Sequence, residues 1–106
     1  SNLTSMETYA GGGGWAAAPA MTVPRHAISV AVDGSKLYAL GGWCYGAVCT
    51  GRVECFDVAA GTWADCPSMI TPRKLFGAVA CGGRLYAFGG GSDKRPEISA
   101  AECWDP

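Results

Sequence analysis

The sequence has little charge of either sign and no long hydrophobic run, and each shortage excludes a class of protein. Of its 106 residues 16% are charged, and eight Lys or Arg against nine Asp or Glu give a net charge of −1. A nucleic-acid surface needs clustered positive charge to displace counterions, so no nucleic-acid partner is predicted. Apolar stretches such as AISVAV are far shorter than the roughly 20 residues of a membrane span, so no membrane partner is predicted either.

Histidine is also scarce, which bears on metal and cofactor sites. His26 is the single histidine, and no C-x-x-C pair accompanies it, whereas zinc takes four closely spaced ligands. The glycine-rich stretches at 11–15 and 89–94 lack the phosphate-binding pattern G-x-x-x-x-G-K-[ST] and open no helix. We therefore expect no metal, no cofactor and no catalytic residues.

The cysteines are even in number but do not suggest a disulfide framework. With 49% hydrophobic residues, the chain has enough apolar side chains for a core of its own. The first ten residues, SNLTSMETYA, have neither the basic start nor the apolar centre of a secretory signal. We expect a cytoplasmic protein with free thiols, and a Cys44–Cys49 bridge across a loop is the alternative. The six cysteines are Cys44, Cys49, Cys55, Cys66, Cys81 and Cys103.

An internal repeat dominates the remaining pattern. LYALGG at 37–42 returns as LYAFGG at 85–90, and the offset of 48 residues holds across the chain without a gap. Chance does not keep ten identities in phase, so the chain is a tandem repeat. The identical pairs are Trp15 and Trp63, Pro19 and Pro67, Met21 and Met69, Pro24 and Pro72, Arg25 and Arg73, Tyr38 and Tyr86, Gly41 and Gly89, Gly42 and Gly90, Glu54 and Glu102, and Asp57 and Asp105.

Each repeat reads as four short strands. HAISVAV and LFGAVAC are apolar on both faces, as in a strand covered on both sides. The turns DGSK and CGGR follow, and then come the strand with the double glycine, the strand RVECFDV or AAECWDP, and a fourth strand that begins at tryptophan. No segment has a helical period. The sequence therefore predicts an all-β fold of antiparallel four-stranded units.

The repeat boundaries indicate an incomplete array. Residues 1–22 read as the third and fourth strands of one unit, 23–70 as a complete unit, and 71–106 as the first three strands of the next. One third strand is surplus, so we expect a segment of a larger array. A stretch of about two units leaves apolar sheet faces bare, and we do not expect it to persist as a compact monomer.

The combination PAM-x-x-PR, LYALGG and VECFDV-x-x-GTW resembles the kelch repeat, and PSMITPR and AECWDP look closest to kelch-like proteins that carry BTB domains. The resemblance covers essentially the whole chain. It implies a kelch-type β-propeller, with about two four-stranded antiparallel blades here as part of a ring of six.

The resemblance also implies structural roles for the repeated residues. The double glycines let the backbone leave the second strand, and the aromatic rings pack between neighbouring blades. A cation-binding cage is the alternative for the rings. We further predict that Glu54 pairs with Arg73, and Glu7 with Arg25, from one blade to the next, the alternative being separate solvent-facing charges. The hallmark residues are Gly41, Gly42, Gly89, Gly90, Tyr38, Tyr86, Trp15, Trp63, Arg25, Arg73, Glu54 and Glu102.

In the kelch-like family, the loops after the second and fourth strands line the face that holds partner peptides. Here the first of these loops, at 43–52, contains Trp and Tyr, which are enriched at binding hot spots. Some family members place arginine two residues after the PR pair to face acidic peptides, but this chain has Ala27 and Leu75 there. Carried over by position, the partner-binding candidates are Trp43, Tyr45, Arg52, Lys94, Arg95, His26 and Lys74.

The function that follows is a non-catalytic protein–protein interaction module whose loop face holds a protein or peptide ligand. The resemblance implies either substrate recognition for a cullin-RING ubiquitin ligase adaptor or an actin-associated scaffold. One alternative is part of a kelch-propeller enzyme of the sugar-oxidase or sialic-acid-epimerase type. Another is an isolated or engineered two-blade unit whose copies assemble into a full propeller. Further partners are therefore kelch blades of the same chain or identical chains in trans.

Overall fold

The described part of the chain is built from strands alone. The computed structural model describes residues 6–10, 14–21, 25–44, 48–93 and 97–106, and every regular element in these ranges is a β-strand. The predicted all-β fold of antiparallel sheets is confirmed. Within the same ranges, no helix has the length and apolarity to cross a membrane.

The central sheet has four strands that follow one another along the chain. β4 (Ser29–Asp33), β5 (Lys36–Leu40), β8 (Val53–Asp57) and β9 (Thr62–Cys66) pair in this order, and each pair is antiparallel. In the turn between β4 and β5, Gly34 has a φ of +60°, which glycine adopts without steric cost. This sheet is one complete copy of the predicted unit.

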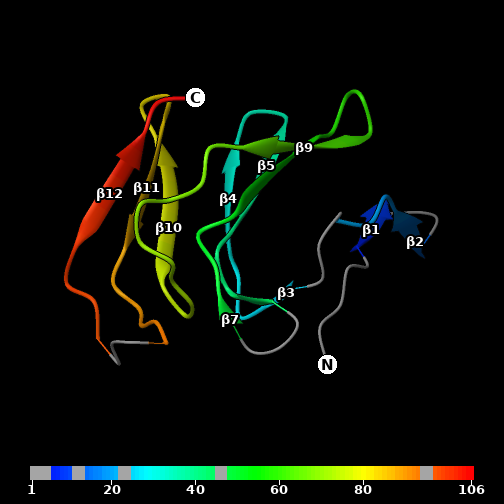
Figure 1. Cartoon of the computed structure of the whole chain (residues 1–106). Coiled ribbons are helices and arrows are strands. Elements are labelled where there is room, and N and C mark those ends of the chain that lie inside the picture. The colour runs from blue at the N-terminus through cyan, green and yellow to red at the C-terminus, as the bar shows by residue number, and fades with distance from the viewer. Residues whose placement is uncertain (1–5, 11–13, 22–24, 45–47, 94–96) are drawn as a thin grey trace.

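Two smaller sheets flank the central sheet (Figure 1). The last sheet contains β10 (Gly77–Cys81), β11 (Arg84–Phe88) and β12 (Ala101–Trp104), in sequence order. The first sheet is the hairpin of β1 (Met6–Ala10) and β2 (Gly14–Ala18). Short strands β3 (Arg25–His26), β6 (Trp43–Cys44) and β7 (Val48–Cys49) form a separate loop sheet, which the sequence analysis did not predict.

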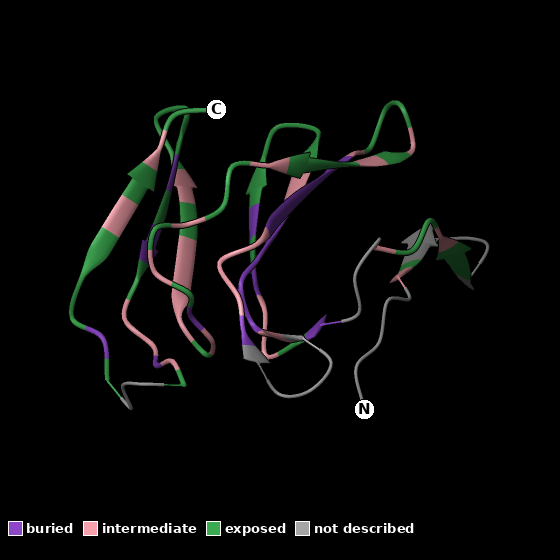
Figure 2. Cartoon of the chain, viewed as in Figure 1, coloured by how far each residue is buried: buried purple, intermediate pink, exposed green. Residues whose placement is uncertain are grey.

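The hydrophobic core lies between the central sheet and the last sheet. On the central sheet Ala31, Tyr38, Leu40, Val53 and Cys55 are buried on one face, and Leu85 of β11 joins them from the last sheet (Figure 2). The rings of Tyr38 and Trp104 meet edge to face with centroids 6.2 Å apart, so aromatic packing joins the two repeats. Burial raises the pKa of Tyr38 to about 12, helped by its contact with Cys55.

Each innermost strand is covered on one face and open on the other. On β4, Ala31 is 4% exposed, whereas Val30 and Val32 on the opposite face are 56% and 58% exposed. On the last sheet the open face carries Val79 and Phe88, which are 45% and 49% exposed. These strands are apolar on both faces, and the described residues bury only one of the two faces.

The double glycines bring the backbones of neighbouring strands into close approach. Gly42 has a φ of +88°, and a Cβ at this position would overlap the carbonyl oxygen of His26. Gly90, one repeat later, has a φ of +82°, and its Cβ would lie 2.5 Å from the carbonyl oxygen of Lys74. Both a left-handed φ and the absence of a side chain are therefore required at these sites.

Candidate interaction site on the loop face

Residues from both repeats meet around Trp43 at the end of the molecule that carries the loop sheet (Figure 1). The Lys74 ammonium lies 3.7 Å from the centroid of the Trp43 ring, within the range of a cation–π interaction. The His26 ring packs against the same indole at a centroid distance of 5.1 Å, and the Trp43 Nε1–H donates to Asp93 Oδ1 at 3.3 Å. We call His26, Trp43, Lys74 and Asp93 the loop-face cluster.

The backbone of the two repeats holds this cluster in place. β3 pairs with β6 so that His26 lies directly opposite Trp43. Lys74 forms an isolated bridge with Gly91, and each N–H donates to the other's carbonyl at 3.0 and 3.2 Å. Asp93 Oδ2 accepts the backbone N–H of Cys49 at 2.7 Å. One carboxylate therefore connects the Trp43 loop of the first repeat to the equivalent loop of the second.

Three residues of the loop-face cluster were predicted from the sequence, and the fourth, Asp93, was not. His26, Trp43 and Lys74 were candidates because of their loop positions, and the structure brings them together. Asp93 stands 50 residues from Trp43, and no local pattern in the sequence relates the two. Such a contact depends on how two sheets pack, which a repeat alignment does not encode.

The remaining partner-binding candidates lie elsewhere. Arg52 forms an ion pair with Asp65 at 2.8 Å, and its Nε lies 3.9 Å from Glu54. The Arg52 side chain thus pairs with residues of the central sheet rather than with the loop-face cluster. Tyr45, Lys94 and Arg95 lie outside the described residues.

Two non-glycine residues beside the cluster have left-handed backbones. Ala27 has a φ of +55° and Leu75, its equivalent one repeat later, a φ of +53°. The Leu75 N–H donates to the Ala27 carbonyl at 3.2 Å, and the Leu75 side chain is 72% exposed. A left-handed residue with a side chain costs about 1–2 kcal/mol, so the same unusual conformation is imposed on both repeats by the surrounding fold.

Arg25 and Arg73 are buried anchors beneath the loop face. Arg25 donates to the carbonyls of Gly41, Arg52 and Ala39 at 3.1, 2.8 and 3.3 Å. Arg73 donates to the carbonyls of Gly89 and Ala100 at 3.2 and 2.7 Å. Each guanidinium therefore ties the double glycine of its own repeat to the start of the third strand.

The predicted pairing of these arginines with glutamates of a neighbouring blade is wrong. Arg25 Nη2 pairs with Glu54 Oε2 at 3.1 Å, and Arg73 Nη2 with Glu102 Oε2 at 3.0 Å. Both pairs lie within one repeat, 29 residues apart along the chain. The cause is the sheet register, which brings the glutamate of the third strand beside the arginine that precedes the first. The alternative of separate solvent-facing charges is also wrong, because the side chains of Arg25, Glu54 and Arg73 have 0% exposure.

Glu102 has a second structural role. Its carboxylate also accepts the backbone N–H groups of Ile70 and Thr71, at 2.5 and 2.9 Å. Partial burial raises the pKa of Glu102, but the hydrogen bonds from Thr71, Ile70 and Arg73 outweigh it and the net pKa is lowered. This carboxylate therefore fixes the connection between the central and last sheets.

Trp63 has a structural role in the central sheet, and the described cysteines are unpaired. The Trp63 Nε1–H donates to the carbonyl of Pro19 at 2.9 Å, which joins β9 to the segment that follows the first sheet. The side chain of Trp15 lies outside the described residues, as does that of Cys44. The other five cysteines, Cys49, Cys55, Cys66, Cys81 and Cys103, are free thiols.

The Cys49 thiol is the cysteine nearest to the loop-face cluster. Burial raises its pKa, and the negative charge of Asp93 adds to the shift, so it is not an activated nucleophile. Among the described residues, no group of three or more His, Cys, Asp or Glu is placed to hold a metal ion.

The four-stranded antiparallel central sheet is followed, 48 residues later, by the last sheet, whose three strands pair in the same order. With paired glycines at equivalent positions and aromatic rings packed between the two sheets, this arrangement defines the chain as a segment of an all-β repeat protein of the propeller type. The Kelch motif matches twice, over residues 24–70 and 72–106. The chain therefore belongs to the kelch-repeat family. Comparison with curated proteins finds no significant match.

Proposed function

We propose that this chain is a non-catalytic recognition module that binds a protein or peptide through the loop-face cluster. The observation that carries the proposal is Trp43, a partly exposed indole held between Lys74 and His26 and fixed by Asp93. A rigid aromatic ring with a neighbouring cation is typical of binding hot spots. Kelch repeats are generally protein-interaction modules, which supports this reading over an enzyme.

A finer proposal follows from the resemblance of PSMITPR and AECWDP to BTB–kelch proteins. The module would recruit substrates for a cullin-RING ubiquitin ligase, or bind a partner in an actin-associated scaffold. Both roles are cytoplasmic, in keeping with five thiols that are free. In either case the scaffold presents loops, and the loops select the partner.

Peptides selected from a random display library against the purified chain provide the test. We expect Trp43→Ala to weaken selected peptides at least tenfold, because loss of a hot-spot aromatic typically costs about 2 kcal/mol or more. Lys74→Met keeps the packed methylene stem but removes the cation, and should weaken binding less. The matched control is Lys36→Met, an exposed lysine at the opposite end of the central sheet.

A thermal melt of each variant separates lost binding from lost folding. The proposal is wrong if Trp43→Ala melts as the parent does and still binds the selected peptides with unchanged affinity. It is equally wrong if Lys36→Met weakens binding more than Lys74→Met.

A further inference from the structure

Two cysteines of the central sheet lie on the same face of neighbouring strands. In the antiparallel pairing of β8 with β9, Cys55 lies opposite Ala64. Two residues further along β9, Cys66 lies opposite Val53. Residues opposite each other in a sheet share a face, and so do residues two positions apart on one strand. Cys55 and Cys66 are therefore diagonal neighbours on the face that packs against the last sheet.

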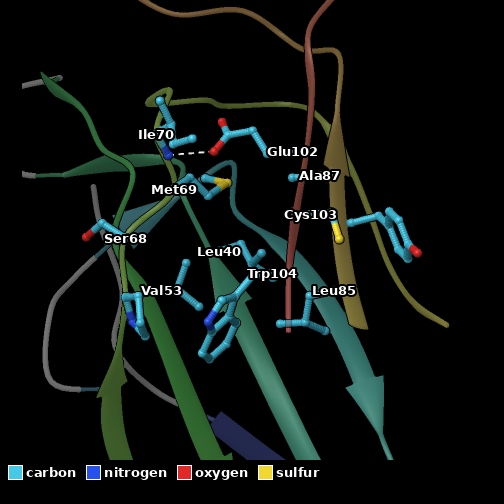
Figure 3. Close-up of a pocket in the computed structure, with 12 residues that line it drawn as sticks. Leu40, Val53, Ser68, Met69, Ile70, Leu85, Ala87, Glu102, Cys103 and Trp104 are labelled. Carbon is cyan, nitrogen blue, oxygen red and sulfur yellow. Dashed lines mark hydrogen bonds between the residues drawn. The ribbon is translucent and has the colours of Figure 1, made fainter. Parts of the chain in front are cut away.

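The two thiols are in contact within the core. Cys55 is 9% exposed, and Cys66 packs against the core cluster from the last position of β9. A hydrogen bond joins the two thiols, and a second joins Cys55 to the Tyr38 hydroxyl. Val53, opposite Cys66, belongs with Leu40 to the same core (Figure 3). The fold thus brings two thiols together that are separated along the chain.

This thiol pair is not a feature of the repeat itself. The residue at the position of Cys66 one repeat earlier is Ala18. The other described thiols, Cys49, Cys81 and Cys103, lie on β7, β10 and β12. The pair is therefore an addition to the central sheet that the kelch repeat does not explain.

The strand that carries Cys66 is the outermost strand of the central sheet. Among the described residues, β9 has ladder pairing with β8 alone. Edge strands of this kind open more readily than inner strands. After Cys66 the chain enters the connection in which the Met69 N–H donates to the Gly51 carbonyl, and this connection leads to Lys74 of the loop-face cluster. A covalent link at Cys66 would hold both the edge strand and the start of this connection.

We propose that Cys55 and Cys66 form a reversible disulfide that locks β9 onto β8 when the chain meets an oxidising small-molecule disulfide such as oxidised glutathione. The half-buried Cys66 thiol loses its proton and attacks one glutathione sulfur, and the other glutathione leaves with that proton. The Cys55 thiol then loses its proton and attacks the Cys66 sulfur, and the second glutathione leaves as a thiol. Two protein thiols are oxidised, and one glutathione disulfide is reduced.

The bond requires a movement of Cys66 toward Cys55. Diagonal neighbours in a sheet are typically about 7–8 Å apart, somewhat less between Cβ atoms, whereas a disulfide joins Cβ atoms about 3.5–4.5 Å apart. Because Cys66 is the last residue of β9, it can bend toward Cys55 while Trp63 stays paired with Phe56. The disulfide therefore tightens the end of the strand and keeps the sheet.

The groups around Cys66 make the first step slow at neutral pH. Burial is the main cause that raises the pKa of Cys66, and Cys55 and Asp65 raise it further against the lowering effect of Lys36. The Tyr38 hydroxyl stays protonated beside them, because its own pKa is raised to about 12. The thiolate is the attacking species, so the rate of disulfide formation rises with pH over the range in which Cys66 ionises.

Peptide mass spectrometry tests the proposal directly. Trypsin releases residues 53–73 as one peptide, in which Cys55 and Cys66 are the only cysteines. The purified native chain is incubated with oxidised glutathione at mildly alkaline pH, alkylated and digested. We expect the peptide to be lighter by two hydrogen atoms and to carry no alkyl group. Treatment with reduced glutathione before alkylation should restore two alkylated thiols.

The Cys66→Ala variant should abolish the disulfide, and it is compatible with the fold because Ala18 stands at the equivalent position. The matched control is Cys81→Ala, which removes an exposed cysteine at the end of β10 and should leave the disulfide unchanged. A disulfide restricts the unfolded chain, so oxidation should raise the melting temperature of the parent and of Cys81→Ala by about 4 °C or more. The melting temperature of Cys66→Ala should not change on oxidation.

Three results would overturn the proposal. The first is two alkyl groups on peptide 53–73 under conditions that convert Cys81 to its mixed disulfide with glutathione. The second is a Cys55–Cys66 disulfide that forms in urea but not in the native chain. The third is an oxidised parent that melts no higher than the reduced parent.

Discussion

Replacing Glu54 by alanine is expected to lower the free energy of unfolding by about 3–5 kcal/mol, because it removes the carboxylate that pairs with the buried Arg25 guanidinium. Typical domains have only about 5–15 kcal/mol of stability, so the variant should be largely unfolded at modest denaturant concentrations. Glu54→Gln keeps a hydrogen-bond acceptor for Arg25 and should lose less stability than Glu54→Ala. Chemical denaturation followed by tryptophan fluorescence gives the free energies of unfolding of the parent chain and of the two variants.

Asp65→Ala is the matched control for Glu54. Asp65 pairs with Arg52 at 2.8 Å, closer than Glu54 to Arg25, yet its side chain is 66% exposed. Exposed ion pairs contribute about 0–1 kcal/mol, so burial rather than distance sets the difference between the two variants. Equal losses for Asp65→Ala and Glu54→Ala would contradict the role assigned to the buried pair.

Replacing Gly42 by alanine is expected to cost about 2–5 kcal/mol, the sum of two steric effects. A side chain at a left-handed φ costs about 1–2 kcal/mol, and forcing atoms into a packed region costs about 1–3 kcal/mol more. The new Cβ would overlap the carbonyl oxygen of His26 and lie 2.8 Å from Cγ2 of Ile28. Because the His26 oxygen belongs to the backbone, no side-chain rotation can relieve the overlap.

Gly34→Ala separates the two effects. Gly34 has a φ of +60°, but no heavy atom lies within 4 Å of a Cβ built there. It should therefore show the backbone cost alone, about 1–2 kcal/mol. The difference between the two melting midpoints measures the close approach at the double glycine. If Gly34→Ala and Gly42→Ala lower stability equally, the close approach of Gly42 to the His26 carbonyl contributes nothing to the cost of the substitution.

The repeat and its strands could be predicted from the sequence because their signals are local. Short runs of apolar residues, the turn at Gly34 and the paired glycines at 41–42 each act over a few neighbours, and each of these signals occurs twice because of the 48-residue offset. The loop sheet escaped prediction, since two-residue strands such as β6 show no alternation.

The partners of the buried arginines could not be predicted from local sequence signals. A tandem repeat places glutamates both before and after Arg73, and spacing alone does not say which one is its partner. The register of β10, β11 and β12 decides for Glu102, because it fixes which side chains share a face. The contacts of Asp93 with Trp43 and Cys49 likewise follow from the packing of one repeat on the other.

The central claim is that the loop face around Trp43 binds the partner, and the tryptophan indole signals in a ¹⁵N–¹H NMR titration test it most directly. The chain has four tryptophans, and Trp63 serves as the internal reference because its indole N–H bonds to Pro19 on another part of the molecule. On addition of a selected peptide, we predict that the Trp43 signal shifts, along with the backbone amides of Cys49 and Gly91, while Trp63 stays in place. A Trp43 signal that does not move, with shifts instead at the turns 33–36 and 81–84, would contradict the account.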